Sequence, residues 1–329
     1  MTEENKNKNI VLKYFNTAEI EAIKELKNRL IITLKTEEIP EKANQLKKEL
    51  QNNNPDIKIN VVFVGEKKEH ENDKWQVKGV KKIIAVASGK GGVGKSTTAV
   101  NLALALANKG LKTALFDADI YGPSLPTMLG YKNTPPYSVD GINFEPYMEC
   151  GIKSMSIGSM IAENTPLIWR GAKACGAIQQ LLTQTNWGDI DLMLIDMPPG
   201  TGDIQITLSQ KLELNGAVII STPQDIALID AVKGLAMFNT VNVPVIGIIE
   251  NMSYYICEKC GHRSDIFGHA GAEQTARQYS VDFLGEIPLH YDIRNNADKG
   301  TPIVVSEPDS VYTSAYETIA DKIIEKLKI

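Results

Sequence analysis

The pattern of hydrophobic and polar positions changes near residue 80. Beyond it, short runs of consecutive apolar residues alternate with longer segments that have helical spacing. Apolar runs this continuous are typical of parallel strands that are covered on both faces. They lie at 83–87, 113–116, 192–195, 217–220 and 245–249, with a weaker run ending at 283–284. The pattern predicts an α/β fold, a doubly wound, mostly parallel sheet with helices on both faces.

Residues 1–78 have a different pattern, dense in Lys, Glu and Asn with only short apolar stretches. Two strands are predicted here, at 30–34 and, from strict alternation, at 57–63. One helix is predicted to begin at Pro40, and an earlier one is predicted to be capped by Thr17. The earlier helix would bury Ile20, Ile23, Leu26 and Leu30. We therefore expect a small α/β accessory domain, joined by a charged linker at 65–78 to a second domain over 79–329.

Composition and charge narrow the functional classes. The net charge of −5 gives no support for general nucleic-acid binding. No run of about 18 apolar residues occurs, so we expect no membrane span. The polar residues 1–9 do not resemble a signal peptide, so we expect a cytoplasmic protein. The mixed charges of 311–327 favour a helix packed on the core over one on a membrane surface.

The run Ser-Gly-Lys-Gly-Gly-Val-Gly-Lys-Ser-Thr at 88–97 lies between the first apolar run and a segment of helix formers. It fits the pattern G-x-x-x-x-G-K-[ST], in the strand-to-helix context that this phosphate-binding motif requires. Glycines let backbone amides approach phosphate, and the helix N-terminus favours an anion. We expect Lys95 to bind the β- and γ-phosphates and Ser96 to bind Mg²⁺. The rest of the predicted loop is Gly89, Lys90, Gly91, Gly92, Val93, Gly94 and Thr97.

Polar residues follow three of the predicted strands. Asp117 and Asp119 open the run Asp-Ala-Asp-Ile-Tyr-Gly-Pro-Ser at 117–124. One of these carboxylates could orient an attacking water or act as an outer Mg²⁺ ligand. The alternative is that the run is a plain turn. Asp196 opens Asp-Met-Pro-Pro-Gly-Thr-Gly-Asp at 196–203, the position of a Walker B carboxylate before a turn that can respond to the γ-phosphate. Asn251 ends a later strand, where it could read a purine edge or form a turn.

The sequence contains four cysteines, too few for a disulfide scaffold in a chain of this length. Cys257 and Cys260 form a C-x-x-C that can turn two thiolates toward one metal, half of what a zinc site or a four-iron cluster needs. A two-fold dimer would supply the second pair. A redox pair and two unligated thiols are the alternatives, and we do not expect the nearby His262 to be a ligand. Cys150 and Cys175 lack metal-ligand spacing and are predicted to be buried.

Taken together, these motifs resemble a known family. The lysine directly after the first glycine of the loop resembles the deviant Walker A motif of the MinD/ParA/nitrogenase-reductase superclass. With the runs at 117–124 and 196–203 and the C-x-x-C, residues 80–329 resemble the Mrp (ApbC) family of iron–sulfur cluster carrier ATPases. The N-terminal residues resemble a shortened MIP18-like domain, which many members of that family carry.

The resemblance implies a role for each nucleotide-site residue. Lys90 would reach the nucleotide of the partner subunit across a homodimer, and Lys95 with Ser96 would hold phosphate and Mg²⁺. Asp119 would lie near the attacking water, Asp196 would be an outer-shell Mg²⁺ ligand, and Asn251 would contact adenine.

The resemblance also implies the cargo. Cys257 and Cys260 would bind a labile [4Fe–4S] cluster that bridges two subunits. Slow, Mg²⁺-dependent ATP hydrolysis would be coupled to loading from scaffold proteins and to transfer to apo iron–sulfur proteins, with no nucleic acid and no membrane as partner.

Three other functions share part of this pattern. A MinD- or ParA-like positioning ATPase should have a basic amphipathic tail or a DNA-binding patch, and the sequence shows neither. An electron donor like nitrogenase reductase should have its cysteines far apart in the sequence. A zinc-stabilised P-loop scaffold protein stays open, because C-x-x-C does not choose between zinc and iron.

Overall fold

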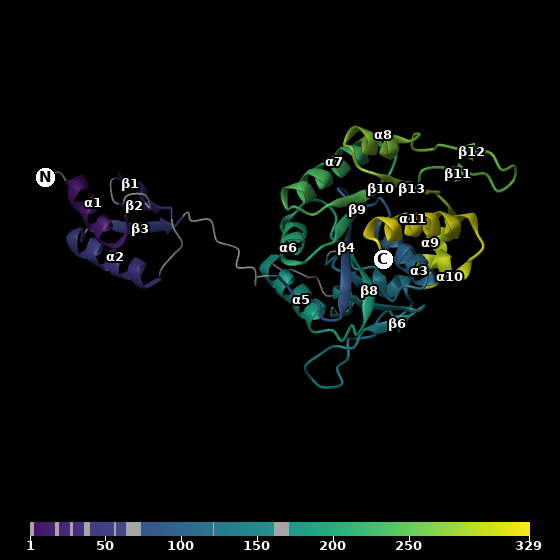
Figure 1. Cartoon of the computed structure of the whole chain (residues 1–329), viewed down its shortest axis with the longest axis horizontal. Coiled ribbons are helices and arrows are strands. Elements are labelled where there is room, and N and C mark those ends of the chain that lie inside the picture. The colour runs from purple at the N-terminus through teal and green to yellow at the C-terminus, as the bar shows by residue number, and fades with distance from the viewer. Residues whose placement is uncertain are drawn as a thin grey trace. The chain divides into compact units, whose positions relative to one another are not determined.

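The computed structural model describes residues 3–16, 20–26, 29–35, 40–55, 57–63, 74–120, 122–160 and 171–329. The chain divides into two compact units, residues 1–73 and residues 74–329 (Figure 1). Each unit has its own hydrophobic core.

The N-terminal unit contains a sheet of three strands and two described helices. In chain order its elements are α1 (Glu3–Tyr14), β1 (Ile20–Leu26), β2 (Arg29–Leu34), α2 (Pro40–Asn53) and β3 (Lys58–Phe63). The central strand β2 pairs antiparallel with β1 and parallel with β3. Its alternate residues Leu30, Ile32 and Leu34 are buried together with residues of both helices, which places the core between the sheet and the helices.

One prediction for this unit is wrong. Residues 20–26 form a strand, although Ile20, Ile23 and Leu26 have helical spacing. The pairing of β1 with β2, which sets Ile23 opposite Ile32, overrides that local pattern. The predicted cap, Thr17, lies outside the described residues. The predicted strand at 30–34, the strand at 57–63 and the helix that begins at Pro40 are confirmed.

An eight-stranded sheet forms the centre of the second unit, and only its edge strand β6 is antiparallel to its neighbour. The six strands predicted from apolar runs are confirmed. Across the sheet the order is β13 (Phe283–Ile287), β10 (Val245–Asn251), β9 (Gly216–Ser221), β4 (Val80–Ala87), β8 (Ile190–Asp196), β5 (Thr113–Asp117), β7 (Ile152–Ser156) and β6 (Tyr147–Glu149).

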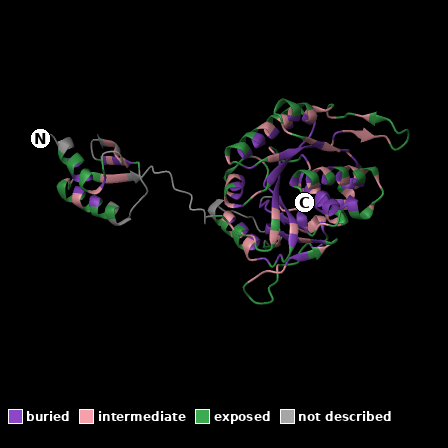
Figure 2. Cartoon of the chain, in the orientation of Figure 1, coloured by how far each residue is buried: buried purple, intermediate pink, exposed green. Residues whose placement is uncertain are grey.

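Helices cover both faces of this sheet (Figure 1). One face carries α5 (Gly171–Thr183), α6 (Asp203–Lys211), α7 (Asp225–Thr240) and α8 (Gly271–Gln278). The other carries α3 (Lys95–Asn108), α9 (Tyr291–Asp298), α10 (Ile303–Ser306) and α11 (Val311–Leu327). The short α4 (Leu125–Met128) and the 3-10 turn η1 (Ile157–Met160) lie near β7. Buried positions concentrate in the sheet and on the inner sides of these helices (Figure 2).

The topology places the candidate residues at one edge of the sheet. The direction in which strands are added to the sheet reverses near β4. After β4 the chain forms β5 on one side of it, and after β8 the chain forms β9 on the other side. Ligands of doubly wound sheets bind at such a reversal, beyond the carboxyl ends of the strands. Residues 88–97, Asp117, Asp196 and Asn251 all follow or end strands there.

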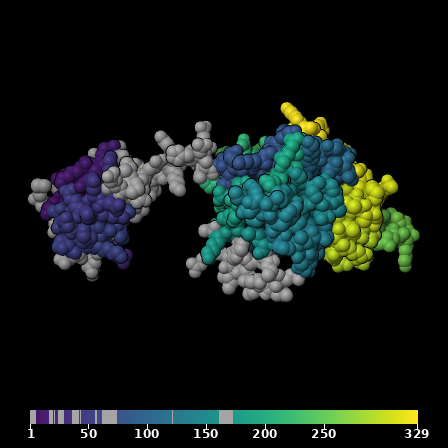
Figure 3. All heavy atoms as spheres, turned by 90° about the horizontal axis from the view of Figure 1, so that it is seen from below, coloured from purple at the N-terminus to yellow at the C-terminus, as the bar shows by residue number. Residues whose placement is uncertain are grey.

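Two peripheral features complete the unit. A hairpin of β11 (Tyr255–Ile256) and β12 (Arg263–Ser264) projects beside the yellow C-terminal helices in two views (Figures 1 and 3). At the other end of the unit, the first described residues are fixed to the C-terminal end of α6. Lys74 Nζ donates to the Gln210 carbonyl at 2.7 Å, and the Trp75 N–H donates to the Lys211 carbonyl at 2.7 Å.

Candidate functional site

The glycine-rich loop runs from the end of β4 to the start of α3, as predicted. Glycine is required in this loop for two different reasons. A Cβ on Gly89 would lie 1.9 Å from the Asp230 carbonyl of α7, so no side chain fits there. Gly92 and Gly94 have positive φ angles of 83° and 79°, which glycine adopts without strain. These glycines therefore let the loop pass close to α7 and reach the start of α3, beyond the carboxyl end of β4, without strain.

Lys95 is the centre of a buried charged cluster. Its ammonium pairs with Asp196, lies 3.2 Å from Ser96 Oγ and lies 4.0 Å from Asp119 Oδ2. The Lys95 side chain is 6% exposed, so this cation is held almost entirely by protein oxygens. Burial raises the pKa of Asp196, while the Lys95 charge opposes that shift. Residues predicted from three separate motifs thus meet at one point.

Asp117 organises the segment that carries Asp119. It lies opposite Asp196 in the register of β5 and β8. Its fully buried carboxylate accepts hydrogen bonds from the Asp119 N–H at 3.0 Å, the Ser124 N–H at 3.2 Å and the Ser156 hydroxyl at 2.9 Å. Burial, with the neighbouring charge of Asp196, raises the pKa of Asp117 to about 7. No sequence motif identified Ser156, on β7, as a member of this group.

Asn251 lies against the phosphate loop. Its Nδ2 donates to the Val93 carbonyl at 2.8 Å, and a Cβ on Gly94 would lie only 2.2 Å from that nitrogen. The end of β10 is therefore packed directly on the loop. The predicted contact between Asn251 and a purine stays a prediction.

The remaining loop residues are placed as follows. Lys90 is exposed at the tip of the loop, and its carbonyl accepts a hydrogen bond from the Ser88 hydroxyl at 2.9 Å. Ser88 in turn accepts the Gly200 N–H at 2.9 Å through its own carbonyl, which joins the phosphate loop to the turn after Asp196. Gly91 is exposed, and Thr97 is half-buried in the first turn of α3. The role of Lys90 toward a partner subunit stays a prediction.

Cys257 and Cys260 lie in the turn of the β11–β12 hairpin. The Cys257 N–H donates to the His262 carbonyl at 2.9 Å, and the Gly261 N–H donates to the Cys257 carbonyl at 2.8 Å. Backbone N–H groups of Lys259 and Cys260 lower the pKa of the Cys257 thiol, which favours the thiolate that binds metal. Within the described residues, no group of three or more His, Cys, Asp or Glu side chains is arranged to hold a metal.

The expectation for the other two cysteines is wrong. Cys150 is exposed and Cys175 is only half-buried. Cys150 has a positive φ of 52° and lies directly after β6, where the chain turns into β7. This turn was not predicted, because the strands on either side of it, β6 and β7, lack a long apolar run.

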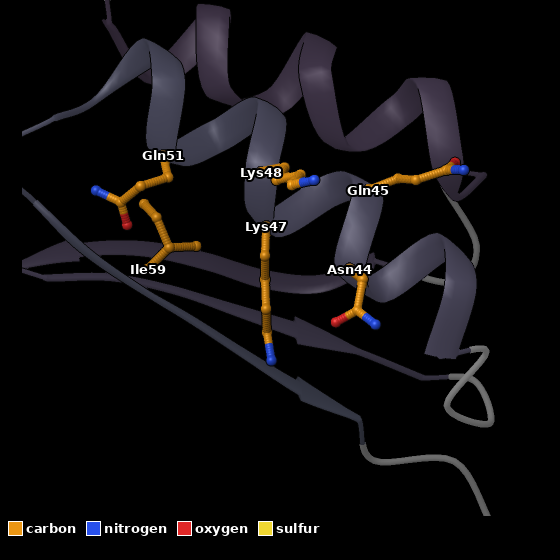
Figure 4. Close-up of a pocket in the computed structure, with 6 residues that line it drawn as sticks. All are labelled: Asn44, Gln45, Lys47, Lys48, Gln51 and Ile59. Atoms are coloured by element: carbon orange, nitrogen blue, oxygen red, sulfur yellow. The ribbon is translucent and has the colours of Figure 1, made fainter.

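Two open pockets lie away from these residues. One, of about 680 Å³, lies in the N-terminal unit beside α2 and β3 (Figure 4). Its lining consists of Asn44, Gln45, Lys47, Lys48, Gln51 and Ile59. The other, of about 540 Å³, lies at the amino-terminal edge of the large sheet, near Gly79 and Trp187. Neither is lined by a predicted site residue. Among the described residues, no helix is long and apolar enough to cross a membrane.

The first strand of the mostly parallel sheet leads through a glycine-rich loop into a helix, and the loop lysine pairs with the carboxylate that ends the adjacent strand. This combination defines a P-loop nucleoside triphosphatase. The family described as ParA, NUBPL iron-transfer P-loop NTPase, matches residues 79–324. The chain belongs to this family, so the predicted fold class and family resemblance are confirmed.

Individual relatives agree with this assignment. The chain is 54% identical, over 76% of its length and 68% of the relative, to the iron–sulfur cluster carrier protein of Escherichia coli strain K12. It is 50% identical, over 77% of its length and 79% of the relative, to the iron–sulfur cluster transfer protein NUBPL of Mus musculus. The nucleotide-binding protein of Archaeoglobus fulgidus, solved in complex with ADP, aligns with a TM-score of 0.64 and 37% identity over 75% of this chain and 96% of that protein.

Proposed function

We propose that this chain is an ATP-dependent carrier that binds a labile [4Fe–4S] cluster and transfers it to apo iron–sulfur proteins. One observation carries the proposal. β10 ends at Asn251 on the phosphate loop, and the same chain reaches the first thiol of the hairpin at Cys257. The nucleotide site and the thiol pair thus share one short segment. The printed names of the relatives from Escherichia coli and Mus musculus support the same cargo.

The nucleotide chemistry in this proposal uses the charged cluster of Lys95. Phosphate oxygens compete with Asp196 for the Lys95 ammonium, since both are anionic ligands of one cation. Oxygen atoms of Ser96 and Asp196 already converge on that cation, which is the donor set a hard ion such as Mg²⁺ prefers. When bound, Mg²⁺ would neutralise charge on the β- and γ-phosphates. Asp119, whose Oδ2 lies 4.0 Å from the Lys95 ammonium, would orient the attacking water.

The cargo chemistry in this proposal requires two copies of the chain. A four-iron cluster takes four thiolates, and one hairpin offers two. In a two-fold dimer the same hairpin of each copy faces its twin, so Cys257 and Cys260 of both subunits would complete the ligand set. Lys90, exposed beside the nucleotide site, would contact the nucleotide of the second copy. We place this slow, Mg²⁺-dependent cycle in the cytoplasm, with cluster scaffold proteins as donors.

The test is anaerobic reconstitution of the full chain with iron and sulfide. We expect thiolate-to-iron absorbance, about four iron atoms per dimer, and a dimer by light scattering. A Cys257→Ser, Cys260→Ser variant should lose all three, whereas the matched Cys150→Ser, Cys175→Ser variant should retain them. Tight zinc binding without iron uptake would refute the carrier proposal and favour a zinc-stabilised scaffold. A monomer that binds iron in each single chain would refute the bridging arrangement.

A further inference from the structure

His290 lies at the N-terminus of α9, directly behind the cysteine hairpin in the fold. It is the N-cap of α9, and its Nδ1 accepts a hydrogen bond from the Asp292 N–H at 3.2 Å. Its ring stacks on Tyr312 with the ring centres 4.3 Å apart. The side chain is 6% exposed, so these contacts fix the ring almost completely.

These contacts determine that the other ring nitrogen, Nε2, carries a hydrogen. When the ring is neutral, the cap bond requires a lone pair on Nδ1, so the proton is on Nε2. When the ring is protonated, both nitrogens carry hydrogen, and Nδ1 can turn to the Asp292 carboxylate at 3.3 Å. In either form Nε2 carries a hydrogen.

Nε2 lies beside the cysteine hairpin. Nε2 of His290 is buried and has no well-aligned hydrogen-bond partner among the described residues, an arrangement that costs free energy. The Glu258 carboxylate is close by, with Oε1 3.3 Å from Nε2. Glu258 lies between the two cysteines and its side chain is 68% exposed, so a small rotation of that carboxylate would align the bond. One residue before His290, the Leu289 N–H donates to the Tyr254 carbonyl at 2.7 Å and fixes the base of the hairpin.

We propose that His290 is a positioning residue for the cysteine pair: it donates its Nε2 hydrogen to Glu258 and thereby holds the hairpin turn in the orientation that retains the cluster. Tyr254 fixes the base of the hairpin and His290 fixes its tip. The two-residue strands β11 and β12 are too short to hold the turn rigid on their own. The consequence for cluster retention rests on the proposed carrier function, but the contact itself does not.

The contact is tested first on the metal-free full chain. His290→Asn keeps an N-cap acceptor for Asp292 but lacks a group at the Nε2 position, and Glu258→Ala removes the acceptor. We expect each to raise hydrogen exchange of hairpin amides 254–264 by about 3- to 10-fold, the range of one partly exposed hydrogen bond. The double variant should exchange no faster than either single variant. Glu213→Ala, which removes an exposed glutamate elsewhere, is the matched control and should change nothing.

The second test measures cluster transfer from the reconstituted chain to an apo-ferredoxin. Both single variants should release the cluster about 3- to 10-fold faster, again without additivity in the double variant. A purely electrostatic role for Glu258 predicts the opposite, since removing a negative charge beside an anionic thiolate cluster should slow release. Unchanged exchange in both single variants, multiplied effects in the double variant, or slower release from Glu258→Ala would each overturn the proposal. If the unmodified chain takes up no cluster, the carrier function fails while the exchange result still decides the contact.

Discussion

The close approach of Asn251 to the phosphate loop leads to a quantitative prediction for Gly94→Ala. Gly94 has a φ of 79°, and a non-glycine residue there costs about 1–2 kcal/mol. The new Cβ would also lie 2.2 Å from Asn251 Nδ2. The amide must then leave the Val93 carbonyl, and stranding a buried hydrogen-bonding group costs about 1–3 kcal/mol. We expect a total loss of about 2–5 kcal/mol in the free energy of unfolding.

Gly92→Ala is the matched control. Its φ of 83° is nearly the same, but a Cβ there meets nothing within 4 Å. It should therefore lose only the backbone contribution of about 1–2 kcal/mol. The difference between the two variants isolates the contact with Asn251. Adding Asn251→Ala to Gly94→Ala should cost little more, because the displaced amide is already lost.

Guanidinium unfolding followed by tryptophan fluorescence measures these differences. All tryptophans of the chain lie beyond residue 73, and Trp187 is 1% exposed, so the signal reports the P-loop unit alone. Equal losses for Gly92→Ala and Gly94→Ala would refute the reasoning. So would a full additional loss when Asn251→Ala is combined with Gly94→Ala.

Two further predictions concern the buried charges. Lys95→Met leaves Asp196 buried without its cation, and we expect a loss of about 3–5 kcal/mol at pH 8. Because burial raises the pKa of Asp196, this loss should become smaller as the pH is lowered, and a loss that does not change with pH would contradict the reasoning. Asp117 has its pKa raised from 3.8 to about 7, so the folded state binds a proton that the unfolded state releases, and this group makes stability fall as pH rises from about 4 to 7. Asp117→Asn should flatten that slope in unfolding curves taken across the same range, and an unchanged slope would show that another group causes it.

The central strands of the P-loop unit could be predicted because each is buried on both faces and is therefore apolar along its whole length. The loop at 88–97 could be located because its fixed positions tolerate few other residues, as the absence of room at Gly89 illustrates. The edge strand β6 and its neighbour β7 were not predicted. Their sequences mix polar and apolar residues, and Ile152–Ser156 is recognisable as a strand only beside β5.

Local spacing failed where pairing between distant residues decides the structure. Ile20 and Ile23 fit a helix until β2 is present to pair with them. α1 was not predicted, because its first turns are polar and its buried apolar residues, Ile10 and Val11, are adjacent and show no helical spacing. At the site, the motifs identified Asp196 and Asp119. No motif revealed that Ser156 supports Asp117 or that His290 stands behind the thiol pair, since those contacts join segments far apart in the chain.

The attachment of Lys74 and Trp75 to the last turn of α6 has a mechanical meaning. The other end of that helix begins at Asp203, where the turn that follows Asp196 ends. A helix is a rigid element, so a displacement of its first turn also displaces its last turn. A rearrangement of that turn that shifts α6 would therefore also shift Lys74 and Trp75, the first described residues of the P-loop unit.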